Sequence, residues 1–303
     1  MNHLIRTLCL LATLIIPAVS AQAQVSQYLA RYGDTMVPVL DQTGDRSTRL
    51  FLVDRQGDTI IFKQSRRGPG TLELSVDLEG LRLRLEYPES YNAARRAVAE
   101  GEFEDAIESL RPIFYPLFKY MDLDEEKTNF HPVMELYLDA LISAEQYDEA
   151  FELIDRVNLG EMPGIIVSKA FSLAEALSDA GQSEKAIELV NDLPLSAERE
   201  EFLPQIMDFA AELRENGELD RALQLYQRVQ QIPGVAVRLE AVLWSAYGNI
   251  LRGRTATAEI FIDEVGEVSR DNRIFSLKKL VEGLIYLERD EPDYIRAMQQ
   301  ISQ

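Results

Sequence analysis

The chain has 303 residues, of which 46% are apolar, so it can bury a sizeable core and is not expected to be disordered. Its formal net charge of −20 disfavours nucleic acid as a partner, because an acidic surface repels phosphate groups. Residues 24–88 carry nine Lys/Arg and nine Asp/Glu, whereas residues 89–303 carry 21 and 42. The net charge therefore belongs to the longer, C-terminal part of the chain.

The first 23 residues have the pattern of a Sec-type signal peptide. A basic start that includes Arg6 is followed by an apolar run over residues 8–19 and then by small residues. The pattern fits cleavage after Ala21 or after Ala23. The run is short for a membrane span, and an uncleaved anchor is the alternative interpretation. The sequence thus predicts a periplasmic or secreted protein with no transmembrane segment in the mature chain.

Cysteine and histidine, on which many catalytic and metal sites depend, are almost absent. Cys9 is the only cysteine and lies in the predicted signal peptide, so the processed chain would form no disulfide and offer no thiol nucleophile. His131 would be its only histidine, which excludes zinc sites built mainly from His and Cys and disfavours His-based triads. No phosphate-binding loop of the G-x-x-x-x-G-K-[ST] type is present. We therefore expect no enzymatic activity, no cofactor and no metal.

Residues 24–88 are expected to form a small β module. Apolar and charged residues alternate with a period of two, which is typical of strands with one buried face. Residues 25–32, which precede the alternation, would form a short helical turn or a linker. The prediction is an antiparallel meander of about four strands, at residues 50–53, 59–63, 72–78 and 81–87.

The rest of the chain, residues 89–303, is organised around an alanine that recurs every 36 residues. A glycine lies five residues before three of these alanines, and Glu145 takes the glycine position before the first. A fixed period in the thirties predicts stacked helical hairpins. The alanine would let two paired helices approach closely, and the glycine would end the first helix. These repeat positions are Ala150, Ala186, Ala222 and Ala258, with Gly181, Gly217 and Gly253.

About six hairpins are expected, and the first and last depart from the period. Before the regular array, residues 120–129 add an acidic insertion, which we interpret as a solvated loop because it lacks the ligand pattern of a calcium site. In the last hairpin Tyr294 stands where the alanine is expected. The hairpins are expected at residues 91–114, 131–157, 165–192, 202–230, 237–268 and 273–301.

Residues 89–303, about seven-tenths of the chain, resemble tetratricopeptide repeats (TPR). The resemblance is carried by a small residue, a glycine, an alanine and a large apolar residue at fixed spacing, as in Ala210, Gly217, Ala222 and Tyr226. It implies a right-handed superhelix of TPR-like hairpins. With the small β meander before this superhelix, the expected fold class is α+β, mainly all-α. The period of 36 exceeds the usual 34 of the family, and Thr255 and Asn249 replace apolar residues.

The resemblance also implies a concave groove lined by the first helix of each hairpin. The residues at the groove-facing positions are acidic with a few large apolar groups, which would suit a basic or amphipathic peptide. The alternative is a solvated helix face with scattered apolar residues. The groove positions are Glu135, Asp139, Phe171, Glu175, Asp179, Met207, Glu215, Glu240, Tyr247 and Leu251.

The function expected from the sequence is an exported, non-enzymatic scaffold that binds protein or peptide partners in cell-envelope assembly or secretion. Two alternatives stay open at this stage. The first is a self-associating structural repeat protein, because the last hairpin has no obvious polar capping helix. The second is a non-catalytic accessory of an enzyme that acts on envelope polymers.

Overall fold

The computed structural model describes residues 21–303 except residues 45, 271 and 290. The predicted signal peptide therefore lies almost wholly outside the described residues. The chain forms two compact units, one that ends at Leu189 and one that comprises Val190–Gln303. None of the described helices is long and apolar enough to cross a membrane.

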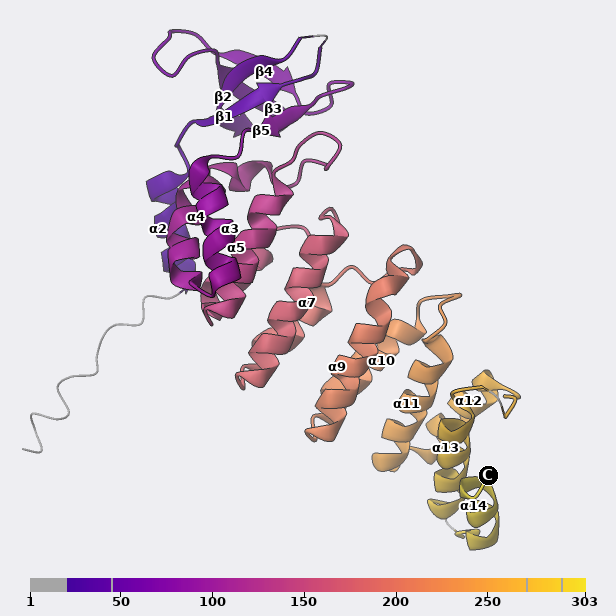
Figure 1. Cartoon of the computed structure of the whole chain (residues 1–303). Helices are drawn as coiled ribbons and strands as arrows, with labels where there is room; N and C mark the ends of the chain where they lie inside the picture. The colour runs from indigo at the N-terminus through magenta and orange to yellow at the C-terminus, as the bar shows by residue number, and fades with distance from the viewer. Residues whose placement is uncertain (1–20, 45, 271, 290) are drawn as a thin grey trace, which may run out of the picture. The chain divides into compact units, whose positions relative to one another are not determined.

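Five antiparallel strands form one sheet within the described residues, in the order β4-β3-β2-β1-β5 (Figure 1). The predicted meander of about four strands is wrong in two respects. A further strand, β1, precedes the expected four, and the last strand crosses over to pair with β1 instead of β4. Period-two alternation finds strands but does not determine which strands pair. The strands are β1 (Val37–Asp41), β2 (Thr48–Gln56), β3 (Thr59–Lys63), β4 (Leu72–Ser75) and β5 (Leu83–Leu85).

The acidic insertion is bound to the edge of this sheet. The backbone N–H of Leu83 donates to the carbonyl of Lys127 at 2.7 Å, and the Asn129 side chain bonds both backbone groups of Leu85 at 2.6 and 3.2 Å. The guanidinium of Arg55 donates to both carboxylate oxygens of Asp122. The acidic residues of the insertion are exposed, as expected of a solvated loop, but the insertion also covers the β5 edge, which would otherwise expose unpaired backbone groups.

The N-terminal helix α2 (Ala21–Tyr32) packs on α4 and α6 rather than on the sheet. Val25 is fully buried, and the Tyr28 ring lies 5.3 Å from the ring of Tyr115, which belongs to α4. Residues 25–32 are thus helical, as one of the two sequence interpretations proposed. Both predicted cleavage positions fall in the first turn of α2, so cleavage would leave these contacts in place.

Paired helices resembling TPR-like repeats make up the rest of the described chain (Figure 1). The recurring alanines at 150, 186, 222 and 258 are all fully buried, which agrees with their expected place between paired helices. The pairs are α3 (Glu89–Glu100) with α4 (Phe103–Leu117), α5 (His131–Ser143) with α6 (Tyr147–Asp155), α7 (Gly164–Asp179) with α8 (Ser183–Asp192), α9 (Leu203–Glu215) with α10 (Leu219–Gln230), α11 (Arg238–Leu251) with α12 (Thr255–Val265), and α13 (Phe275–Leu287) with α14 (Tyr294–Ile301).

The turn within each of the regular hairpins is a left-handed cap. At Gly181, φ is +74°, and the next N–H, that of Gln182, donates to the carbonyl of Leu177 at 2.8 Å. Gly217 and Gly253 have φ of +85° and +68° and are followed by the same bond. This is the bond pattern of the Schellman motif, in which glycine avoids the steric cost of the left-handed region. Glu145 adopts φ of +57° at the equivalent position, so it bears that cost.

The last hairpin uses a different small residue. Tyr294, at the expected alanine position, is 67% exposed, whereas Ala297 three residues later is buried. A Cβ on Gly283 of α13 would lie 2.5 Å from a side-chain atom of Ile301. The close approach of α13 and α14 therefore depends on Gly283 and on the buried Ala297, and the register of the pair is shifted by three residues.

Replacing Glu145 with glycine is expected to stabilise the first unit by roughly 0.5–1 kcal/mol. The left-handed conformation costs a residue with a Cβ about 1–2 kcal/mol, and the added flexibility of glycine in the unfolded chain offsets part of the gain. Glu145 is exposed, so the substitution disturbs no core contact. Urea unfolding followed by circular dichroism measures the difference.

The matched control is Gly181→Glu, the reverse exchange in the next hairpin. A Cβ on Gly181 would meet nothing within 4 Å, so the cost of this variant is conformational rather than steric. We expect a loss of about 1 kcal/mol. If the Glu145→Gly variant unfolds at a lower urea concentration than the native chain, the turn assignment is wrong.

Candidate functional site

The predicted groove positions in the first unit are acidic and only partly available. Glu135 and Asp139 of α5 are half-buried, and Asp139 forms an ion pair with Lys169 at 2.6 Å. Glu175 and Asp179 of α7 are exposed. Phe171 is only 2% exposed, so its predicted role as an apolar anchor is wrong. Its helix, α7, packs on both α5 and α6, and a side chain facing both neighbours is enclosed.

The groove positions in the second unit retain one clear apolar anchor. Met207 is buried, so it too cannot be the exposed anchor that was predicted. Glu215 is exposed, and Glu240 is half-buried and pairs with Arg273 at 2.8 Å. Leu251 is 56% exposed and lies one turn from the half-buried Tyr247 on α11. Tyr247 and Leu251 therefore form an apolar stripe at the predicted position.

An aromatic cluster lies at the N-terminal end of this stripe. The Arg214 guanidinium sits 3.7 Å from the centroid of Trp244, which stacks with Tyr226 at 6.3 Å and meets Tyr247 edge-on at 5.6 Å. The chain's own arginine thus occupies the cation position over the indole ring. We interpret the cluster as packing that fixes Tyr247, not as an empty cage for a cationic ligand.

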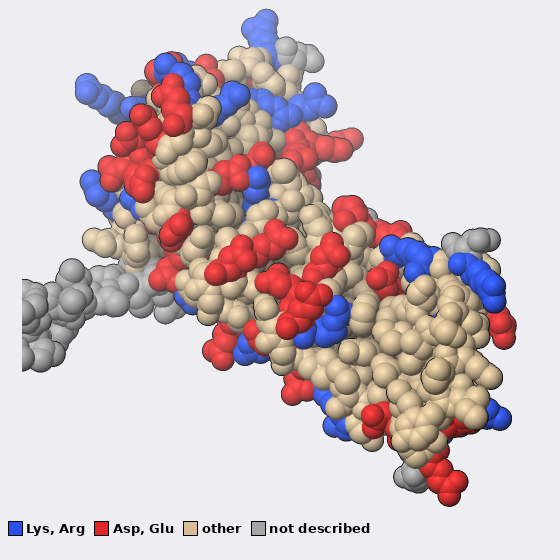
Figure 2. Space-filling model, turned by 60° about the horizontal axis from the view of Figure 1, so that its bottom comes forward, with Lys and Arg blue, Asp and Glu red and all other residues tan. Residues whose placement is uncertain are grey.

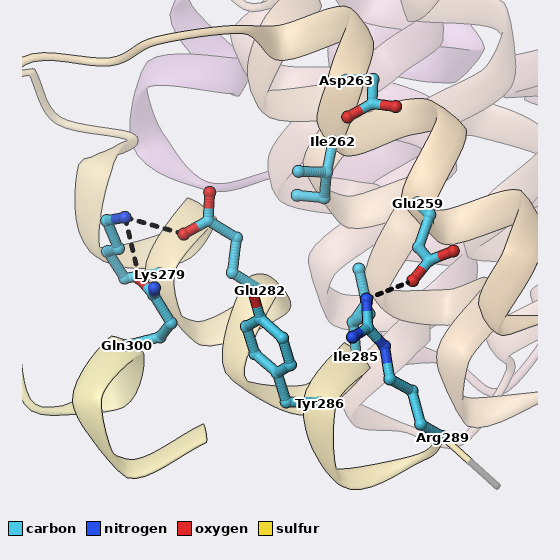
Figure 3. Close-up of a pocket in the computed structure, with 9 residues that line it drawn as sticks. All are labelled: Glu259, Ile262, Asp263, Lys279, Glu282, Ile285, Tyr286, Arg289 and Gln300. Atoms are coloured by element: carbon cyan, nitrogen blue, oxygen red, sulfur yellow. Dashed lines mark hydrogen bonds and ion pairs between the residues drawn. The ribbon is translucent and has the colours of Figure 1, made fainter. Parts of the chain in front are cut away.

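A depression of about 460 Å³ lies between α12, α13 and α14 (Figure 3). Ile262, Ile285 and Tyr286 supply its apolar part, and two ion pairs flank them. Lys279 pairs with Glu282 at 2.7 Å, and Arg289 pairs with Glu259 at 2.8 Å. The sequence analysis did not predict this site. The only sequence pattern at this site is a pair of charged residues three apart, Lys279 and Glu282, and such pairs are too common on helix surfaces to single it out.

The two cations that line this depression have partners within the chain. Lys279 also donates to the side-chain oxygen of Gln300 at 2.9 Å, and Arg289 lies 4.7 Å from the Tyr286 ring. Both cations are therefore satisfied within the chain, so neither offers an unpaired charge to an anionic ligand. Asp263 lies on the rim of the depression (Figure 3). Within the described ranges, no three His, Cys, Asp or Glu side chains are placed to hold a metal ion.

A buried polar cluster in the first unit is built around Glu149. The Glu149 carboxylate is 1% exposed and accepts hydrogen bonds from Arg111 at 2.8 Å, from the Tyr115 hydroxyl at 2.7 Å and from the Tyr137 hydroxyl. The Arg111 guanidinium also lies 4.2 Å from the ring centroid of Tyr28 in α2.

The pKa values of the two tyrosine hydroxyls in this cluster are strongly raised. Burial, and then the nearby charge of Glu149, raise the pKa of Tyr115 and of Tyr137 well above the usual range. Shifted groups often mark catalytic sites, but such sites must also be reachable by a substrate. This cluster is enclosed by helices, so we assign it a structural role.

Comparison with known proteins adds little to the geometry. No protein-family model matches the sequence, and no curated protein does. Among solved structures, the chain is similar to a crystal structure of nearly identical TPR-like repeats from a putative kinesin light chain of Podosopora anserina. The identity is 19%, the match covers 58% of this chain and 91% of that chain, and the TM-score is 0.32. Similarity at this level says nothing of function, so the functional argument rests on this chain's own residues.

The buried tyrosines are expected to make the protein unstable in alkali. Burial raises the pKa of Tyr226 to about 12, whereas a tyrosine in the unfolded chain titrates near pH 10. The unfolded state therefore releases its proton first, and the stability that is present below pH 10 is lost as the pH rises toward 12. For this residue alone the loss amounts to roughly 2–3 kcal/mol.

Urea midpoints measured between pH 9 and pH 12 check this, with phenolate absorbance as the second readout. Tyr226→Phe keeps the ring and removes the ionisable group, so its stability should fall less steeply above pH 10. The control is the same exchange at an exposed tyrosine, Tyr294→Phe, since Tyr294 is 67% exposed. If the urea midpoints of the native chain and of the Tyr226→Phe variant fell equally steeply with pH, Tyr226 would not contribute to the loss of stability.

Proposed function

We propose that the protein is an exported scaffold that binds a basic or amphipathic segment of a partner protein along the first helices of its hairpins. The observation that carries the proposal is the exposed stripe of Tyr247 and Leu251 on α11 in a chain of TPR-like hairpins. In each compact unit, the same helix positions also hold exposed carboxylates, including Glu175 in the first unit and Glu215 in the second.

The chemistry of these faces favours a partner that is both basic and apolar. Among the charged side chains visible on the helical part, Asp and Glu are more prominent than Lys and Arg (Figure 2). They raise the association rate of a positively charged segment, because attraction over the surface steers its approach. Affinity comes mainly from desolvated apolar contacts, for which Leu251 is the best-placed residue. Because Phe171 and Met207 are buried, the proposed contact is narrower than the groove expected from the sequence.

Export is supported by residues 1–23 alone. A basic start, an apolar run and small residues at the cleavage positions are the features that a signal peptidase substrate needs. A role in cell-envelope assembly or secretion follows from this location and remains part of the same proposal. The absence of cysteine after residue 23 suits an oxidising compartment, where a free thiol would be liable to unwanted disulfides.

Replacing Leu251 with alanine should weaken binding of the partner by about 1 kcal/mol or more. A partner would first be isolated from envelope extracts, purified and titrated against the native chain. Trp244 is the only tryptophan and contacts Tyr247, so its fluorescence reports occupancy of the stripe directly. Ile260→Ala is the matched control, because Ile260 is 66% exposed but lies on a second helix, α12. Equal losses for the two variants, or no loss for either, would rule out this face.

Blocking signal-peptide cleavage tests export independently. Ala21 occupies a required small position in both predicted cleavage sites, whereas Ala23 does so in only one. We expect Ala21→Arg to abolish processing, and Ala23→Arg to direct it to the bond after Ala21. Intact mass and cell fractionation check the result. Recovery of the native chain from the cytoplasm with residues 1–23 attached would contradict export.

A further inference from the structure

The last helix, α14, presents an apolar stripe to solvent. Tyr294 is 67% exposed, Ile295 72%, Met298 73% and Ile301 48%. The three aliphatic residues are spaced three apart, so they form one continuous row on the helix surface. Single exposed apolar residues are common on proteins, but a contiguous row of large ones marks a surface that another molecule covers.

This stripe is the charge-poor part of an acidic chain. Residues 292–303 contain one acidic residue, Asp293, and one basic residue, Arg296, which pair with each other at 3.4 Å. The C-terminal part of the second unit shows a broad surface with few charged side chains (Figure 2). A basic partner would be drawn to the acidic helices elsewhere on the chain instead. A second copy, with its own charge of −20, can approach closely only where the surface carries no net charge.

The stripe is also self-complementary. Ile295 and Ile301 each lie three residues from Met298, on opposite sides of it. If two copies of α14 pair antiparallel about a two-fold axis at Met298, each Ile295 faces the other copy's Ile301. The same pairing sets Arg296 against Gln300, so no like charges meet.

A head-to-tail contact between α14 and α3 would have no matching apolar surface. The first helix of the array, α3, exposes mainly polar and charged side chains, among them Asn92, Arg95 and Arg96. Burying the α14 stripe against such a surface would leave those polar groups without water. We propose that α14 forms an antiparallel, two-fold symmetric contact with α14 of a second copy, and that the protein is therefore a homodimer.

Light scattering over a series of protein concentrations tests the proposal with the full chain. The native protein is expected to be a dimer that dissociates on dilution, and Ile295→Asp with Met298→Asp should weaken it roughly tenfold or more, because dimerisation would bury the new carboxylates. Both sites are exposed in one copy, so the variant should keep the helical circular dichroism spectrum of the native chain. Ile260→Asp is the control at an equally exposed isoleucine. A native monomer at all concentrations would overturn the proposal in favour of a different protein on this surface, and higher oligomers would overturn the two-fold arrangement.

Cysteine cross-linking locates the axis. In a Cys9→Ser background the chain has no cysteine, so each introduced thiol is unique. Met298→Cys places the two thiols at the proposed axis, where closely packed helices bring the Cα atoms within disulfide range. Oxidation should give a covalent dimer with Met298→Cys and not with Ile260→Cys. Equal cross-linking of both variants, or none by Met298→Cys in a sample that scatters as a dimer, would overturn the assignment.

Discussion

The structure depends on close contact between the two helices of each hairpin. Such contact needs a small residue on one helix and a turn short enough to return the chain at once. Buried alanines such as Ala186 and Ala222 provide the first, and left-handed glycines such as Gly181 provide the second. A hairpin that had only the small residue, or only the tight turn, would leave its apolar stripe partly exposed. Because each hairpin then packs on its neighbours, the same requirement recurs along the chain, and the 36-residue period follows from it.

The first unit joins other elements to its hairpins through polar contacts. Glu149 lies in the first turn of α6, where sequence alone would place an exposed carboxylate that favours the helix dipole. It is buried instead, and Arg111 of α4 together with two tyrosine hydroxyls compensates its charge. Removing one partner from such a group is costly, because the other charge stays buried and unpaired. The contact of Arg111 with Tyr28 extends the cluster to α2, so the N-terminal helix is held by the same charges that join α4 to α6.

Periodicity was sufficient to predict the helices, because it records a packing requirement that repeats. It was insufficient wherever a position depends on a third element. Phe171 and Met207 fall on helix faces that look open when one hairpin is considered, and neighbouring helices enclose them. The predicted strand pairing was wrong for a similar reason. The strand β5 pairs with β1 and is covered by residues around Asn129, which are distant in sequence. Leu251 and Tyr247 were placed correctly because one helix determines their position relative to each other.

The proposed partner-binding stripe on α11 and the proposed dimer contact on α14 depend on different physical forces. Added salt is expected to affect them differently. Binding of a basic segment to carboxylates such as Glu215 depends on attraction between opposite charges, which salt largely screens beyond a Debye length of about 8–10 Å at physiological ionic strength. Pairing of two α14 stripes joins like-charged chains through apolar contact, so the same screening removes a repulsion and strengthens it. Added salt therefore acts on the two surfaces with opposite sign. The exposed Leu251 and the exposed Met298 are chemically similar, and it is the charge around each of them that determines which partner it can meet.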